Sequence, residues 1–287
     1  MKYFPKSELV LNSSNEVYHL GLKPENISNK IILVGDQERV GLVSSFFDEI
    51  THRSQHREFN CHTGMYKSKR ISVLSTGIGT DNIDITINEI DALLNIDLGT
   101  RTEKAQKQYA EFIRIGTCGI LQKDIPLHSY ILSSHALGLD NIAYFYDIDL
   151  SQNSSLLTEI TSAIQFPKSV IPYLVESSFD LTEKLNSDKV HQGITITSSG
   201  FYGPQGRQLR LKTNTEELND QLTGFRSNTL RITNFEMESS ALFALSNALG
   251  HKATTICLGI ANRPLMHFSE GYRQEMLEMI KYTLDRI

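Results

Sequence analysis

The stretch Phe112-Ile-Arg-Ile-Gly-Thr-Cys-Gly119 places an arginine inside an apolar run that ends in small residues. Its β-branched and aromatic residues are typical of a strand, and its near-continuous apolar character indicates a central strand covered on both faces. An arginine buried there without a partner is costly, so Arg114 requires either an internal carboxylate or a bound oxyanion. The residues alone leave both partners open.

Similar short apolar runs recur along the chain, at residues 31–34, 71–74, 130–132, 193–197 and 254–260. Helical spacing of apolar residues predicts helices over 83–94 and 237–249, and Gly250 stands where a left-handed residue would end the second. Strands that alternate with helices predict an α/β protein, a three-layer α/β/α sandwich. Since no linker or repeat divides the chain, we expect one domain over residues 1–287.

The composition is that of an ordinary globular protein, in which 28 Lys and Arg against 33 Asp and Glu give a net charge of −5. This balance argues against nucleic-acid binding. The three cysteines lack CxxC spacing, which argues against a disulfide framework and a structural zinc. Residues 1–16 lack the apolar core of a signal peptide, and no run reaches the ~18 apolar residues of a membrane span. We therefore expect a soluble, cytoplasmic protein without membrane contact.

Two further segments end apolar runs with glycine. Gly35 ends the run 31–34, and Arg39 follows four residues later, so backbone N–H groups and a guanidinium are available to an anion. A tight turn followed by a solvated arginine is the alternative. The segment 75–79, Ser-Thr-Gly-Ile-Gly, matches the dinucleotide fingerprint only loosely because the third glycine is absent. A close turn between strand and helix is favoured there, and a Rossmann dehydrogenase is disfavoured.

Two polar segments follow later strands. Gly200-Phe-Tyr-Gly-Pro-Gln-Gly-Arg207 offers the Phe201 ring, the Gln205 amide and the Arg207 guanidinium, which together suit a planar ligand; a surface turn is the alternative. Glu236 and Glu238 stand at a strand-to-helix junction. Carboxylates suit sugar hydroxyls because they accept several hydrogen bonds, but acids at a helix N-terminus also interact favourably with the helix dipole.

Together and in this order, these segments resemble the nucleoside phosphorylase family, and most closely its uridine-cleaving members. The resemblance runs nearly end to end and includes the segments 17–22, 34–40, 56–59 and 260–263. It implies the family's nucleoside phosphorylase-like fold, with a central mixed β-sheet.

The resemblance implies phosphorolysis, in which inorganic phosphate and uridine give uracil and ribose 1-phosphate without a further cofactor. Purine or methylthioadenosine phosphorolysis, and a non-catalytic nucleoside-binding protein, are the alternatives. Purine-type relatives carry an aspartate where this chain has Asn262, which favours a pyrimidine. Arg263 is expected to brace Arg207 or its loop, with a surface salt bridge as the alternative.

The site residues that the resemblance implies fall into two groups. Phosphate would be held by Gly35, Arg39, Arg114, Thr117 and, from a neighbouring subunit, Arg57. The nucleoside would be held by Phe201, Gln205, Arg207, Glu236, Met237, Glu238 and the neighbour's copy of His19. The catalytic residues among these would be Arg114, Thr117, Gln205, Arg207 and Glu238. Shared sites imply at least a homodimer, and several family members are hexamers.

Some positions depart from the family pattern. Certain relatives hold a potassium ion at the dimer interface, and the matching positions here are Glu58, Ile78 and Asn82, with asparagine in place of serine. We interpret Cys118, next to Thr117, as a small buried packing residue rather than a nucleophile.

Overall fold

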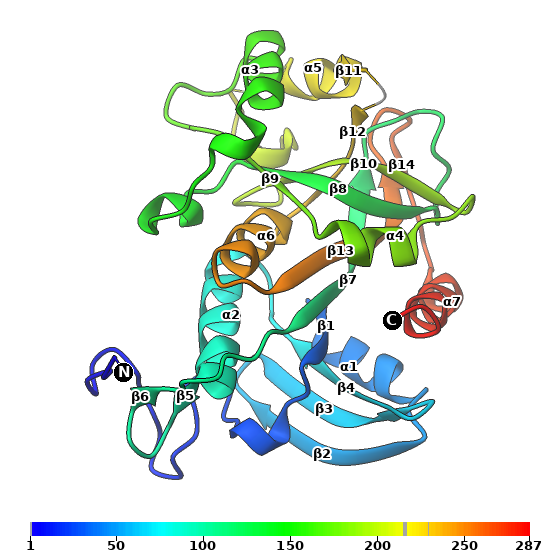
Figure 1. Ribbon diagram of the computed structural model, residues 1–287. Helices are drawn as coiled ribbons and strands as arrows, with labels where there is room; N and C mark the ends of the chain where they lie inside the picture. The colour runs from blue at the N-terminus through cyan, green and yellow to red at the C-terminus, as the bar shows by residue number, and fades with distance from the viewer. Residues whose placement is uncertain (1, 215–216, 229) are drawn as a thin grey trace.

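The computed structural model describes residues 2–214, 217–228 and 230–287. In these residues one large mixed sheet of 12 strands runs through the molecule (Figure 1). Its main path is β11 (Arg226–Ser227), β12 (Leu230–Glu236), β10 (Val190–Thr197), β8 (Tyr130–Gly138), β13 (Lys252–Asn262), β7 (Glu111–Ile120), β1 (Lys30–Val34), β4 (Lys69–Ser75), β3 (Phe59–Tyr66) and β2 (Glu49–His56).

Most neighbouring strands from β12 to β4 pair in parallel, except β13 and β8, which are antiparallel at the middle of the sheet. Strand β7 pairs in parallel with β1 and β13, and β1 with β4, whereas β2, β3 and β4 form an antiparallel meander. Two short strands join the sheet, β9 (Tyr173–Glu176) beside β8 and β14 (His267–Phe268) beside β13. A separate pair consists of β5 (Ile96–Asp97) and β6 (Thr102–Glu103).

One end of the sheet closes on itself. Strand β12 pairs with β10 and also, antiparallel, with β7, where Phe235 lies opposite Gly119 and Asn234 opposite Ile120. Strands β7, β13, β8, β10 and β12 therefore form a closed ring within the mixed sheet. This closure places the carboxyl ends of β7 and β12 side by side.

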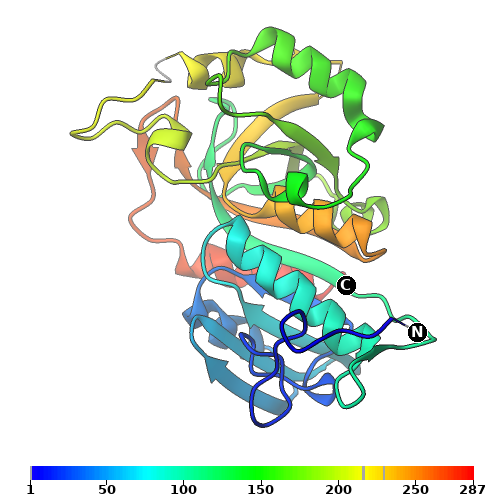
Figure 2. The same cartoon turned by 90° about the vertical axis from the view of Figure 1, so that its left-hand side faces the viewer.

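Helices cover both faces of the central strands, as the continuous apolar runs predict. They are α1 (Gln37–Ser44), α2 (Thr80–Asn95), α3 (Ser154–Ala163), α4 (Phe179–Leu185), α5 (Leu218–Gly224), α6 (Ser239–Ala248) and α7 (Arg273–Leu284). On β1, Ile31 and Leu33 pack in one core with α2 and α6, whereas Ile32 and Val34 pack in another with α1 and α7. Figures 1 and 2 show α2 and α6 on one side of the sheet, and α3 and α5 at its ring end.

The expected α/β fold with a central mixed sheet is confirmed, although the ring was not foreseen. Each of the six apolar runs lies in a strand, and the expected helix over 83–94 is α2. The other, over 237–249, begins two residues later, at Ser239, and Gly250 follows it with a φ of +78°. No helix in the described ranges is long and apolar enough to span a bilayer.

Candidate active site

A cavity of about 930 Å³ opens where the carboxyl ends of β1, β7 and β12 meet the loop 200–207. It gathers most of the residues that the sequence singles out. Those on its wall are Gly35, Arg39, Arg114, Thr117, Phe201, Gln205, Arg207, Glu236, Met237 and Glu238, together with Glu58, Ile78 and Asn82. The predicted phosphate and nucleoside residues of one chain therefore face one space, apart from His19 and Arg57.

One end of the cavity is cationic. Arg39 in the first turn of α1 is buried, and its guanidinium donates a hydrogen bond of 3.3 Å to the carbonyl oxygen of Ile115. The solvated arginine that sequence alone allowed is therefore wrong. Burial lowers the pKa of Arg39, and the charge of Arg114 lowers it further. Both guanidinium groups line the same cavity.

Arg114 pairs with internal carboxylates, one of the two partners that the sequence allowed. Its guanidinium pairs with Glu238 through a short hydrogen bond and lies 3.4 Å from a carboxylate oxygen of Glu236. Burial opposes the positive charge, but Glu238 and Glu236 outweigh it and raise the pKa of Arg114. The guanidinium folds back over Gly116, where an added Cβ would lie only 2.2 Å from Nη1. The arginine is therefore fixed at the wall of the cavity.

The two glutamates differ in what they can offer a ligand. Glu236 accepts hydrogen bonds from the backbone N–H groups of Glu238 and Ser239, at 2.9 to 3.1 Å, and from the Thr197 hydroxyl at 2.6 Å. Burial, despite Arg114, raises the pKa of Glu236. The helix-terminus interpretation therefore describes Glu236, whose oxygens serve the start of α6.

Glu238 is held differently. One carboxylate oxygen pairs with Arg114, and the other accepts the backbone N–H of Gly79 at 2.9 Å. Gly79 has a φ of +101° and immediately precedes α2, so the segment 75–79 is the close turn that the sequence favoured. The turn positions Glu238, a role that the sequence did not reveal.

The loop 200–207 forms the opposite end of the cavity. Gln205 is buried, and its side-chain oxygen accepts a short hydrogen bond from Arg207. The Arg207 guanidinium lies 3.8 Å from the centre of the Phe201 ring and donates to the Phe201 carbonyl oxygen at 2.7 Å. Burial and then Arg263 lower the pKa of Arg207 to about 10. An amide, a guanidinium and a ring thus form one recognition element, and of these three groups only the Phe201 ring is exposed.

Asn262 and Arg263 stand behind this loop. The Asn262 amide donates to the carbonyl oxygens of Gln122 and Ile125, at 3.0 and 2.9 Å, so its donors serve the backbone. An added Cβ at Gly119 would contact both Arg207 and Arg263, which therefore flank this glycine as two neighbouring cations. The expected bracing of Arg207 by Arg263 stays a prediction, and the described residues show no salt bridge of Arg263.

His19 and Arg57 lie together, and outside the described lining of the cavity. The His19 ring is 2.6 Å from Glu89 of α2, and the Arg57 guanidinium is 5.4 Å from the centre of the Tyr18 ring. His56, next to Arg57, lies 2.8 Å from the His19 carbonyl oxygen. This arrangement leaves the cavity of a single chain without the two residues that the resemblance assigns to a neighbouring subunit.

The three positions matched to a potassium site line the same cavity. The Asn82 amide donates to the Ile78 carbonyl oxygen at 3.2 Å, and an added Cβ at Gly77 would contact both Glu58 and Asn82. The three residues are therefore close together. Potassium binding there stays a prediction.

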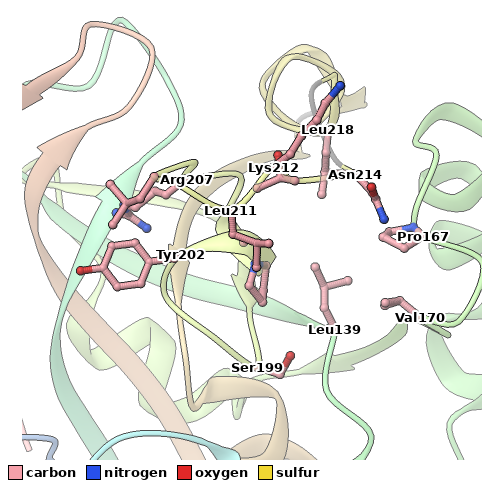
Figure 3. Close-up of a pocket in the computed structure, with 14 residues that line it drawn as sticks. Leu139, Pro167, Val170, Ser199, Tyr202, Arg207, Leu211, Lys212, Asn214 and Leu218 are labelled. Atoms are coloured by element: carbon pink, nitrogen blue, oxygen red, sulfur yellow. The ribbon is translucent and has the colours of Figure 1, made fainter.

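A second cavity, of about 470 Å³, lies beyond the loop 200–207 (Figure 3). Its wall is mostly apolar, and Leu139, Val170 and Leu211 point into it. Arg207 lines both cavities. Arg207, at the loop 200–207, therefore also borders a mostly apolar space.

The fold and this cavity define a phosphorylase. Residues 29–276 match the phosphorylase superfamily, and the chain belongs to that superfamily. It is similar to a uridine phosphorylase of Thermococcus kodakarensis, with 32% identity over 90% of this chain and 82% of the relative. It also resembles a DeoD-type purine nucleoside phosphorylase of Oceanobacillus iheyensis, with 26% identity over 83% of this chain and 84% of that protein.

A solved structure agrees with this assignment. A nucleoside phosphorylase of Trypanosoma brucei, reported to show uridine phosphorylase activity, superposes with a TM-score of 0.86 at 27% identity. The match covers 97% of this chain and 99% of the other. The resemblance to the nucleoside phosphorylases is thereby confirmed.

Proposed function

We propose that this protein is a pentosyltransferase that cleaves uridine with inorganic phosphate, giving uracil and ribose 1-phosphate. The observation that carries the proposal is one cavity with arginines at one end, an amide and guanidinium at the other, and Glu238 between them. Relatives named uridine phosphorylase support the choice of substrate.

At the cationic end, Arg39, Arg114, Thr117 and the Gly35 backbone hold phosphate beneath the sugar. Phosphate attacks the anomeric carbon while the bond to the base breaks. Positive charge develops on the sugar, and the bound phosphate dianion both stabilises this charge and supplies the nucleophile. Glu238 and Met237 orient the ribose, and Glu236 supports them from the start of α6.

At the other end, the loop 200–207 receives the leaving base. The Gln205 amide donates to uracil O2 and accepts from N3–H, while Arg207 donates to O4 and Phe201 offers a ring face. Negative charge accumulates on these oxygens as the bond breaks, so the hydrogen bonds strengthen in the transition state. Losing one such donor typically costs ~2.7 to 4 kcal/mol.

We propose that two protomers share each active site. Arg57 of one protomer adds to the phosphate end of its neighbour's cavity, and His19 reaches the 5′-hydroxyl of the nucleoside there. Their position beside Tyr18 and outside their own cavity supports this exchange. The minimal assembly is then a homodimer, and a homohexamer of such dimers is the larger alternative.

The three buried, free cysteines suit a reducing compartment, so we place the reaction in the cytoplasm. Purine phosphorolysis is the second candidate because a purine phosphorylase is also a relative. The binding of Asn262 to backbone carbonyls weighs against it, since no acid stands there to protonate a purine.

A nucleoside panel tests the assignment. The protein is incubated with uridine, thymidine, inosine, adenosine or 5′-methylthioadenosine, each with and without phosphate, and released base is measured. We expect phosphate-dependent release that is fastest from uridine, and Arg207→Ala should slow it ~10² to 10³-fold. Faster cleavage of inosine would assign the enzyme to purines, and cleavage without phosphate would exclude phosphorolysis.

A further inference from the structure

A buried carboxylate beneath α6 is not in contact with the cavity. Asp140 follows β8 and accepts hydrogen bonds from the Tyr173 hydroxyl at 2.8 and 2.9 Å, the Ser240 hydroxyl at 2.5 Å and the Ile142 N–H at 2.9 Å. None of these donors carries a charge. Burying a carboxylate is costly, and several hydrogen bonds to the charged form offset that cost. Each donor must therefore keep its position relative to the Asp140 carboxylate.

The tyrosine is a fixed donor in this cluster. Tyr173 is fully buried, and its ring packs on Gly138, where an added Cβ would lie 2.4 Å away. Burial and the Asp140 charge raise the pKa of Tyr173, so its hydroxyl remains protonated. The Tyr173 hydroxyl thereby holds the Asp140 carboxylate in place.

Asp140 is also linked to the glutamates in the middle of the cavity. Ser240 is the second residue of α6, and its N–H donates to the Thr197 hydroxyl at 2.9 Å. That hydroxyl donates to Glu236 at 2.6 Å. A continuous chain of hydrogen bonds therefore runs from Asp140 through Ser240 and Thr197 to Glu236.

The first turn of α6 determines where Glu238 lies. Glu238 is the residue directly before the helix, and its carboxylate reaches Gly79 and Arg114. If the first turn shifts, these contacts shift with it. Misplacement by about 1 Å can cost as much as 10²-fold in rate.

We propose that Asp140 is a positioning residue that fixes the first turn of α6 through Ser240 and thereby sets Glu238 against the ribose. The proposal rests on the proposed function, because Glu238 is the sugar-binding residue there. Gly35 follows β1 and Arg39 lies in α1, and the hydrogen-bond chain reaches neither of them. Of the phosphate ligands it reaches Arg114, which contacts Glu236 and Glu238. Phosphate binding at Arg39 should therefore change less than nucleoside binding.

The test compares Asp140→Asn, Ser240→Ala and the double variant with the wild type. We expect Asp140→Asn and Ser240→Ala each to raise the KM for uridine about 10-fold. The KM for phosphate should rise by less, because Arg114 loses its contact with Glu238 while Gly35 and Arg39 keep their places. Because both variants break one link, the double variant should be no worse than the more affected single variant. Ser246→Ala is the matched control. The hydroxyl of this buried serine in the same helix has no hydrogen-bond partner among the described atoms, so the variant should leave both KM values unchanged.

A structural measurement separates this proposal from the assignment of substrate. In a crystal structure of Asp140→Asn, the Glu238 carboxylate should leave the Gly79 N–H and Arg114. Retention of both contacts would overturn the positioning role, whichever nucleoside is cleaved. Additive effects in the double variant, or a lower melting temperature with unchanged KM values, would also overturn it. A wild type that fails on uridine contradicts the proposed function alone.

Discussion

The position of the Arg114 guanidinium depends on the absence of a side chain at Gly116. A Cβ there would lie 2.2 Å from Arg114 Nη1 and 2.9 Å from Cys257 Sγ, and the guanidinium is already fixed by two carboxylates. Gly116→Ala should therefore displace the guanidinium into the cavity and weaken phosphate binding. We expect kcat/KM for phosphate to fall about 100-fold, which is about 2.7 kcal/mol.

Steady-state kinetics at varied phosphate concentrations check this prediction. Gly224→Ala serves as the control, because an added Cβ there meets nothing within 4 Å. If Gly116→Ala retains wild-type kinetics while its melting temperature drops, the glycine serves packing only.

The buried thiol of Cys61 makes stability depend on alkaline pH. Burial raises its pKa to about 12, whereas an unfolded chain releases this proton near the usual cysteine value of about 8.5. Above that value the unfolded state binds fewer protons than the folded state, so the free energy of unfolding falls as pH rises. The loss should reach about 2 kcal/mol at pH 10.

Urea unfolding at pH 7 and pH 10 measures this loss, and Cys61→Ala isolates it from other titrating groups. The variant is expected to be less stable at both values but to lose about 2 kcal/mol less between them. Equal losses in the two proteins would show that the thiol does not contribute.

At the scale of elements, the start of α6 depends on Glu236. Its carboxylate accepts from two backbone N–H groups at the helix N-terminus and from Thr197. In Glu236→Gln, an amide NH₂ replaces one of the accepting oxygens and faces these donors. Hydrogen bonds to charged groups contribute roughly 1.5 to 3 kcal/mol, so we expect the free energy of unfolding to fall by about 2 kcal/mol.

Urea unfolding at pH 7 measures the change. Glu183→Gln on the exposed side of α4 is the control and should stay within about 0.5 kcal/mol of the wild type. A similarly small change for Glu236→Gln would mean that α6 begins without this carboxylate.

The sequence predicted strands best where other elements cover both of their faces. Residues 31–34 are continuously apolar, and residues 112–115 are apolar except for Arg114, because separate helix layers cover the two sides of these strands. Strand β2 of the meander was not predicted, since most of its residues are polar and one of its faces is exposed. The ring was also missed, because the pairing of Phe235 with Gly119 joins residues more than a hundred positions apart and leaves no local pattern.

At the scale of the whole molecule, one chain's residues account for most but not all of the candidate site. Glycines and arginines at the ends of strands predicted the cavity. A glycine there lets a ligand approach the backbone closely, and a buried arginine needs an anionic partner. The residues alone left Glu236 open between sugar binding and the helix N-terminus, and only the hydrogen bonds of its carboxylate separate the two. Asp140 could not be assigned from sequence, since its role depends on a hydroxyl group a hundred residues away. His19 and Arg57 lie outside the cavity of their own chain, so only an assembly can test their roles.

Coexpression of two inactive variants tests site sharing. Arg57→Ala and Arg114→Ala should each lack activity, since both remove a phosphate ligand. In a heterodimer of the two, one site contains both defects and the other contains neither. Equal coexpression makes half of the dimers mixed, so about a quarter of the wild-type activity should return. If Arg57 instead served its own chain's cavity, every site would carry one defect and the mixture would stay inactive.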